Sequence, residues 1–175
     1  MNLEISKIQL LNPSLSSVKY EKRNATRALD GILTFQSNGC AETSDQHNKQ
    51  WWKAEFAEIH VVTSIKILPR YDCCRERYSH VTVDTSLDGN TWTLCAHLGG
   101  SLKTAAINSW VDAKCPESTM AKYVKIILHD KMKLMLCEVQ AYGYKPGTLH
   151  NATDNRQPLR SMDHLTFILI LDSLG

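Results

Sequence analysis

The chain has 175 residues, 43% of them hydrophobic and 22% charged, which is enough for one ordinary globular domain with a buried core. Its 20 Lys and Arg residues nearly balance 18 Asp and Glu residues, so the formal net charge is only +2. This balance excludes the basic surface that nucleic-acid binding requires, and we expect no nucleic-acid partner.

The cysteines and the glycosylation motifs indicate the cellular compartment in which the protein folds. The 6 cysteines form an even set, and N-x-Thr sequons begin at Asn24 and Asn151. Both features are typical of proteins that fold in the oxidising secretory environment, so we predict a secreted protein. The opening segment MNLEISKIQLL has no cationic stretch followed by a sustained apolar run, so no signal peptide is visible in it.

Apolar and polar residues alternate in short segments that are separated by turn residues. Val124, Ile126 and Leu128, for example, alternate with Lys125 and His129. A period of two indicates strands with one buried face, so the sequence predicts an all-β fold, an antiparallel β-sandwich with short loops or turns of helix. The expected strands, in chain order, are 52–57, 61–68, 79–86, 91–98, 122–129 and 136–144.

Between the second and third expected strands, the segment RYDCCRER (70–77) places two adjacent cysteines between two arginines. Neighbouring Cα atoms are about 3.8 Å apart, and a bond between Cys73 and Cys74 would close no useful loop. If these residues are oxidised, the reason is the flat, apolar surface they present. Arg70 and Arg77 would place rigid donor groups beside it, and Asp72 would orient one of them. Such a surface suits a deoxy sugar.

Two other interpretations of this segment remain open. Its charged residues Arg70, Asp72, Arg75, Glu76 and Arg77 could form an ordinary surface ion-pair network. Alternatively, the two cysteines could be redox or nucleophilic thiols, because nearby Arg side chains lower the pKa of a thiol. No partner base stands at a suggestive spacing, so we expect no enzyme.

Further along the chain, Asp88, Gly89 and Asn90 predict a hairpin between the third and fourth strands, because Gly and Asn adopt positive φ at little cost. The tryptophans, including Trp51 and Trp92, are expected to pack in the core or at its edge rather than to serve as sugar platforms.

After the last expected strand, Pro146 and Gly147 break the pattern, and the polar run 148–163 has little to bury. We therefore predict one domain over 1–145 and a poorly ordered tail of unknown role over 146–175. The tail contains LTFILIL (165–171), far shorter than the roughly 20 residues of a membrane-spanning helix, so we expect no membrane span.

Five segments together resemble one known family. They are ALDG (28–31), WWKAEF (51–56), RYDCCRER (70–77), SLDGNTW (86–92) and CEVQAYG (137–143). In this order they resemble an F-type lectin, or fucolectin, of the discoidin-like superfamily, over residues 2 to 145. The resemblance implies a galactose-binding-like jelly roll that binds terminal L-fucose on glycans, stabilised by Ca²⁺, without catalysis and with a role in innate immune recognition.

The resemblance also assigns the sugar-binding residues. Arg70 and Arg77 match the arginines that bind the sugar, Asp72 matches the carboxylate that orients them, and Cys73 with Cys74 matches a vicinal disulfide against the sugar ring. The family has a histidine at the position of Glu42. His47 lies in the same loop and could approach the site instead, or it could be a solvated loop residue. Glu42 could itself accept a hydrogen bond from a hydroxyl.

For Ca²⁺, Asp30 and Glu138 match the family's side-chain ligands. Hard cations take six to eight oxygen ligands. The remaining ligands implied by the resemblance are the backbone carbonyls of Arg27, Ile32, Gly39 and Cys137. Asp30 could instead form an Asx turn before Gly31, and Glu138 could be an exposed strand residue.

The resemblance further implies disulfides that join Cys40 to Cys137 and Cys95 to Cys115, one pairing of the fifteen that six cysteines permit.

Two functional alternatives stay open at this point. The chain could be a discoidin-like adhesion or lipid-surface module, with Leu33 and Phe35 exposed at a loop tip, or a degenerate lectin that has lost its sugar affinity together with the histidine. A homo-oligomer would supply avidity to a weak sugar site.

Overall fold

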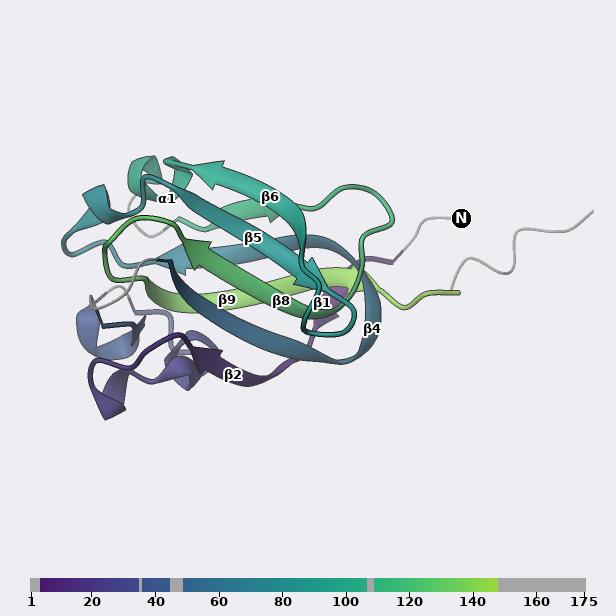
Figure 1. The fold of residues 1–175 in the computed structure, drawn as a ribbon, viewed down its shortest axis with the longest axis horizontal. Coiled ribbons are helices and arrows are strands. Elements are labelled where there is room, and N and C mark those ends of the chain that lie inside the picture. The colour runs from purple at the N-terminus through teal and green to yellow at the C-terminus, as the bar shows by residue number, and fades with distance from the viewer. Residues whose placement is uncertain (1–3, 35, 45–48, 107–108, 148–175) are drawn as a thin grey trace, which may run out of the picture.

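The computed structural model describes residues 4–34, 36–44, 49–106 and 109–147 (Figure 1). Strands dominate this part of the chain, with short helical turns between them. In chain order the elements are β1 (Ser6–Ile8), β2 (Leu10–Leu15), η1 (Glu21–Arg23), η2 (Ala25–Ala28), η3 (Ser37–Gly39), β3 (Ala41–Glu42), β4 (Gln50–Pro69), η4 (Arg75–Arg77), β5 (Val81–Ser86), β6 (Thr93–Gly99), α1 (Ser101–Thr104), β7 (Val111–Lys114), β8 (Met120–Leu128) and β9 (Met135–Tyr144).

The long strand β4 organises the fold. Its first half pairs with β2 and β8, and its second half pairs with β7 and β9, always antiparallel. From β8 the sheet continues through β5 to β6, and from β9 it continues to β1. Strand β4 therefore crosses from one layer to the other, and the two layers lie face to face (Figure 1). The predicted antiparallel sandwich is confirmed.

The core lies between the two layers and follows the alternation of the strands. In β4, Trp52 and Ala54 point inward in the first half, and Ile65 and Ile67 do so in the second; none is more than 2% exposed. Trp52 also donates from its indole Nε1 to the carbonyl of Ala25, 3.0 Å away, so it anchors η2 to the core. The loops at this end of the sandwich are thus fixed to the sheets.

The expected strands differ from the observed ones in one informative way. The segments 52–57 and 61–68 belong to the single strand β4, because the polar stretch between them does not end the strand. The pairing with β8 shifts its register between Glu55 and His60, at the point where β4 passes from one sheet to the other. The other expected strands correspond to β5, β6, β8 and β9, with bounds shifted by one or two residues, whereas the short strands β1, β2, β3 and β7 were missed.

Strand β9 ends at Tyr144, next to the predicted domain boundary at residue 145. The greater part of the predicted tail, 148–175, lies outside the described residues, so its role and order stay predictions. In the part of the chain that the structure describes, every helix is too short or too polar to cross a membrane.

Candidate functional site

The segment between β4 and β5 holds the cysteine doublet. Cys73 and Cys74 are bonded to each other and are both partly exposed, so the doublet offers a sulfur surface and no free thiols. Cys74 adopts a left-handed conformation with φ of 66°, and η4 begins directly after it. At the end of the segment, the buried Tyr78 hydroxyl donates to the carbonyl of Met135 at 2.7 Å. The segment is therefore fastened to β9. Because Cys73 and Cys74 are bonded to each other, neither is a free nucleophilic thiol, and the redox interpretation stays a prediction.

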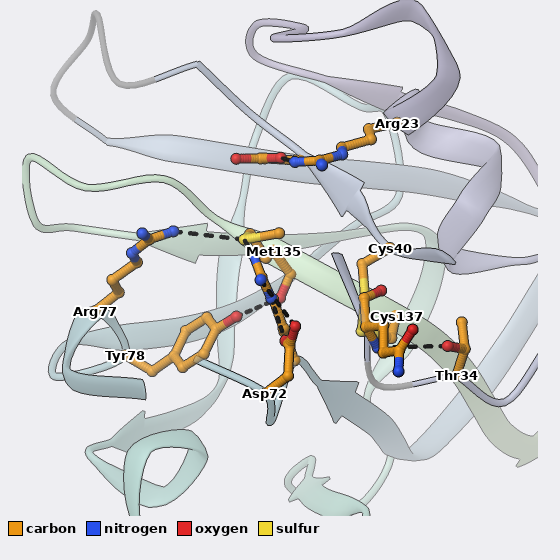
Figure 2. Close-up of a disulfide and its surroundings, with 11 residues drawn as sticks. Arg23, Thr34, Cys40, Asp72, Arg77, Tyr78, Met135 and Cys137 are labelled. Carbon is orange, nitrogen blue, oxygen red and sulfur yellow. Dashed lines mark hydrogen bonds and ion pairs between the residues drawn. A yellow bond between two sulfur atoms is a disulfide. The ribbon is translucent and has the colours of Figure 1, made fainter. Parts of the chain in front are cut away.

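Arg70 and Arg77 converge on the same atom. The Nη1 atom of each lies 3.5 Å from the Sδ atom of Met135, so the two nitrogens are no more than twice that distance apart (Figure 2). Met135 is buried beneath them, with 1% of its surface exposed. A thioether sulfur is a weak acceptor, and a guanidinium has five N–H donors, so both arginines keep donors for a ligand.

Asp72 holds the first of these arginines. Arg70 donates from Nη2 to Asp72 Oδ2 at 2.9 Å, and its Nε also bonds to Oδ1, which makes a two-pronged ion pair. The hydrogen bond raises the pKa of Arg70 and lowers the pKa of Asp72. Because the fork is fixed before any ligand arrives, Arg70 loses little rotational freedom on binding.

The alternative of a general ion-pair network finds little support in the geometry. Arg75 stacks over the Tyr71 ring, with Cζ 5.2 Å from the ring centroid, and donates to the carbonyl of Ala105. It therefore holds the loop after α1 and does not take part in the pair of Arg70 and Asp72. In this segment Arg75 thus has a structural role, whereas Arg70 and Arg77 keep N–H donors that a ligand can use.

Glu42 lies beside this site but is covered. It pairs with Met135 in the β3–β9 register, is 3% exposed, and forms an ion pair with Arg23 (Figure 2). Arg23 also donates from Nη2 to Asn38 at 3.3 Å. A ligand hydroxyl would reach the Glu42 carboxylate only after Arg23 moved, so the role of Glu42 as an acceptor stays a prediction. His47 lies outside the described residues.

A second candidate site lies next to the arginine site. It is the acidic cluster of Asp30 and Glu138, of which Glu138 lies on β9. Glu138 is 3% exposed, and the backbone N–H of Gly31 donates to its Oε2 at 3.2 Å. Burial, with a smaller contribution from the nearby Asp30 carboxylate, raises the pKa of Glu138 to about 7. The alternative that Glu138 is an exposed strand residue is therefore wrong.

Asp30 does form the expected Asx turn. Its Oδ1 accepts from the N–H of Ile32 at 2.9 Å around Gly31, whose φ is +73°. Its other carboxylate oxygen lies 3.4 Å from Nη1 of Arg27. The turn and a metal-binding role are compatible, because a carboxylate has several lone pairs.

These residues fit a hard cation. Two carboxylates lie close enough for one to raise the pKa of the other, and one of them is buried, which is costly for a negative charge without a cation. Among the described residues no three His, Cys, Asp or Glu side chains are grouped to hold a metal ion, so further ligands would have to be backbone carbonyls. The predicted carbonyls of Arg27, Ile32, Gly39 and Cys137 belong to the same loops and to β9, and their role stays a prediction.

The three disulfides implied by the resemblance are all present, as Cys40 with Cys137, Cys73 with Cys74, and Cys95 with Cys115. The first connects the residue after η3 to β9, between Met135 and Glu138. Three residues of strand span about 10 Å, so this bond lies between the arginine site and the acidic cluster. Figure 2 shows Cys40 and Cys137 on the side of Met135 that faces away from Arg77.

Sequence reasoning missed Arg23 and Met135. Arg23 reaches Glu42 only through the folding of the loop between β2 and β3, and Met135 is the floor of the site only because β9 runs beneath the segment 70–78. Neither residue stands in a motif, so the sequence carried no signal for them.

Known proteins similar to this chain indicate its family. The F5/8 type C domain family matches residues 14–139. Fucolectin-1 of Anguilla japonica is 30% identical over 125 residues, which cover 68% of this chain and 67% of that protein. Fucolectin of Anguilla anguilla is 30% identical over 128 residues, which cover 70% of this chain and 78% of that protein.

A solved structure is also similar. The F-lectin (fucolectin) from the serum of Morone saxatilis, the striped bass, matches with a TM-score of 0.67 and 25% sequence identity. The match covers 77% of this chain and 47% of the other, so this chain spans about half the length of the striped bass structure.

Proposed function

We infer that this chain, which belongs to the F5/8 type C domain family and within it to the F-type lectins, binds carbohydrate and recognises terminal L-fucose on glycans. Proteins of this lectin family bind sugars and are not enzymes. The binding residues would be Arg70 and Arg77 as donors and the disulfide of Cys73 and Cys74 as an apolar surface.

One observation carries this proposal. Two guanidinium groups meet over the sulfur of Met135 next to an accessible vicinal disulfide. A 6-deoxy sugar has hydroxyl groups on one part of its ring and a methyl group on another. Charged donors form stronger hydrogen bonds to hydroxyl oxygens than neutral ones do, and a sulfur surface suits the methyl group. The site therefore matches both halves of the ligand.

Calcium binding is part of the proposal. Asp30 and Glu138 would contribute carboxylate oxygens, and the carbonyls of Arg27, Ile32, Gly39 and Cys137 would complete the ligand set. A bound Ca²⁺ would supply positive charge to the buried carboxylate of Glu138. Glu138 lies on β9, as does Met135, so the order of the metal site would bear on the position of the sugar site.

The expected affinity for one monosaccharide is low. About a dozen heavy atoms at about −0.3 to −0.5 kcal/mol each give about −4 to −6 kcal/mol, which corresponds to dissociation constants from roughly millimolar to tens of micromolar. A secreted protein that recognises glycans in innate immunity would need several sites at once, and a homo-oligomer would provide them.

The direct test is a glycan array probed with the full chain, with and without EDTA. We expect signals on fucosylated glycans that free L-fucose competes away and that EDTA weakens. A folded protein that binds no fucosylated glycan would overturn the proposal and would support a degenerate lectin, in which the ion pair of Arg23 and Glu42 replaces the family's histidine.

A lipid-surface module is the second candidate, and one observation favours it. Ile32 and Leu33 are consecutive loop residues with exposed fractions of 54% and 56%. Exposed apolar side chains at a loop tip could insert into a membrane surface. Phe35, the other residue expected there, lies outside the described residues. Binding to liposomes that fucose does not compete would favour this function over the lectin.

A further inference from the structure

A second concave surface lies far from the arginine site, at the other end of β5. It is a groove of about 310 Å³. This volume is at the lower end of the range for small-molecule sites, which suits a ligand of one or two rings. Side chains that line this groove include Asn12, Lys53, Glu55, Asp88, Trp92 and Tyr123.

Two aromatic rings form one side of the groove, and both are held in place. Lys125 places its Nζ 3.7 Å from the centroid of the Trp92 ring. Tyr123 packs against Gly89, where an added Cβ would lie 3.4 Å from Cε2 of the tyrosine. Gly89 has a φ of +76°, so the turn requires a residue without a side chain there. Trp92 is half-buried, which is compatible with the predicted core-edge packing, and its exposed part lines the groove.

The opposite side is polar. Asn12 donates from Nδ2 to Glu55 Oε1. Asn12 has a φ of 47°, and the pairing of β2 with β4 shifts its register between Leu11 and Ser14, so a bulge turns this side chain toward Glu55. Asn adopts this left-handed conformation more readily than most residues do. The groove thus has a donor and an acceptor fixed relative to each other.

Asp88 fixes the rim of the groove. Its Oδ1 accepts from the N–H groups of Asn90 and Thr91 at 2.8 and 2.7 Å, which orders the β5–β6 turn that carries Trp92. The charges at the groove cancel, because Lys53 and Lys125 offset Glu55 and Asp88. With no excess of positive charge to attract a phosphate or sulfate, the groove favours a neutral ligand.

We propose that this groove is a second carbohydrate site, which takes a neutral pyranose such as a β-D-galactoside or β-D-glucoside. A pyranose of this kind has a face of C–H groups, which would lie against Trp92 and Tyr123, and a rim of hydroxyl groups, which would meet Asn12, Glu55 and Lys53. The site is independent of the fucose site in its residues and in the chemistry of its ligand.

The two sites are too far apart for one monosaccharide. Strand β5, Val81–Ser86, separates the segment 70–78 from the turn at Gly89, and six strand residues span about 20 Å. Figure 1 shows β5 running between these two ends of the sandwich. Two weak sites on one domain would let it bind two ends of a branched glycan, or two glycans on one surface, with higher avidity than either site alone.

The test uses the ¹⁵N-labelled full chain carrying Arg77→Ala, so that fucose binding does not contribute. We expect methyl β-D-galactoside or methyl β-D-glucoside to shift the Trp92 indole N–H and the Gly89 amide, with a millimolar dissociation constant. Tyr123→Ala should abolish these shifts. Tyr142→Ala is the matched control, because Tyr142 is also a half-buried tyrosine beside a lysine but lies on β9.

Should Tyr123→Ala fail to fold, Asn12→Ala is the second variant, since Asn12 is exposed; it should weaken binding several-fold. Shifts that persist unchanged in Asn12→Ala and in Tyr123→Ala would overturn the proposal. So would the absence of shifts with both glycosides, or shifts with AMP alone, which would indicate a nucleotide groove. Because Arg77 is replaced throughout, failure here is separate from failure of the fucose proposal.

Discussion

The arginine site lies over Met135 on β9, and the acidic cluster includes Glu138 three residues further along that strand, but the two regions differ in how their charges are satisfied. At the first, Arg70 and Asp72 neutralise each other and stand ready without any ion. At the second, the buried Glu138 lies near Asp30, and its carboxylate is held by one backbone N–H. The first region is preorganised by protein groups alone, whereas the second gains most from a cation. Binding and metal dependence can therefore be separated by mutation.

The largest expected effect is on the first region. Arg77→Ala removes one of the two converging guanidinium groups, and hydrogen bonds to charged groups contribute about 1.5 to 3 kcal/mol each. We expect fucose affinity, measured by calorimetry with methyl α-L-fucoside, to fall by roughly tenfold to a hundredfold. The melting temperature should not change, because the contact that Arg77 makes in the described structure is with a weak sulfur acceptor.

Lys114→Ala is the control for that measurement, since it removes an exposed cation from β7, away from the site. It should leave affinity unaltered. If Arg77→Ala also leaves affinity unaltered, Arg77 does not belong to the site, and the distinction between the two regions loses its basis.

The next largest effect is on the acidic cluster. Without metal, we expect the substitution of Glu138 to increase stability, whereas the substitution of Arg77 decreases sugar affinity. Burial raises the pKa of Glu138 to about 7, above its ordinary value of 4.5, so the metal-free protein loses stability as the pH rises from about 4.5 to about 7. Glu138→Gln keeps an acceptor for the Gly31 N–H and carries no charge. In EDTA at pH 8 we expect this variant to melt higher than the wild type, by roughly 2 to 4 °C per kcal/mol recovered.

Adding Ca²⁺ sharpens the same experiment. The wild type should gain thermal stability with calcium, and Glu138→Gln should gain little, because one ligand is missing. An equal calcium response in both proteins would remove Glu138 from the ligand set. Asp112→Asn, which changes an exposed carboxylate on β7, serves as the control.

A smaller effect is expected from the sulfur surface. Replacing both Cys73 and Cys74 by serine keeps the size of the side chains but substitutes hydroxyls for an apolar surface. Since this bond closes almost no loop, stability should change little, whereas fucose affinity should fall by about 1 kcal/mol, roughly fivefold. Titration by calorimetry against the wild type measures this. Equal affinity would show that the bond only shapes the backbone.

The smallest effect concerns the Asp88 carboxylate, which accepts hydrogen bonds from two backbone N–H groups and one hydroxyl of its own turn. The N–H groups of Thr91 and Asn90 and the Ser86 hydroxyl lower the pKa of Asp88 to about 2. Because this value lies below the ordinary 3.8, the stabilising effect is complete above about pH 4 and is lost as the pH falls toward 2. Carboxyl ¹³C chemical shifts would show the titration midpoint, and a midpoint near 3.8 would contradict the hydrogen-bonded turn.

Much of the fold could be predicted from local patterns. Alternation of apolar and polar residues predicted six strands, and the Asp88-Gly89-Asn90 turn lies where its chemistry required, with Gly89 at φ +76°. The short strands β1, β3 and β7 could not be predicted, because a few residues do not establish a period. The continuity of β4 depends on pairing with strands from distant parts of the chain, which local alternation does not record.

The part of the candidate site that could be predicted is the part whose residues lie in one short segment of the sequence. Arg70, Asp72, Cys73, Cys74 and Arg77 are neighbours in sequence, and the structure brings them together. Contacts between distant segments escaped prediction, since they arise only from the packing of loops on β9. The clearest example is Glu42, which is buried and forms an ion pair with Arg23.

The continuity of β4 also has a consequence for motion. Arg70 directly follows a strand that is paired into both layers, so the base of the arginine site cannot open without separating strands of the core. In hydrogen-exchange experiments, the amides at the end of β4 should exchange only through global unfolding, and ligand binding should slow them in proportion to the overall gain in stability. We therefore expect the base of the arginine site, at the end of β4, to exchange together with the core strands.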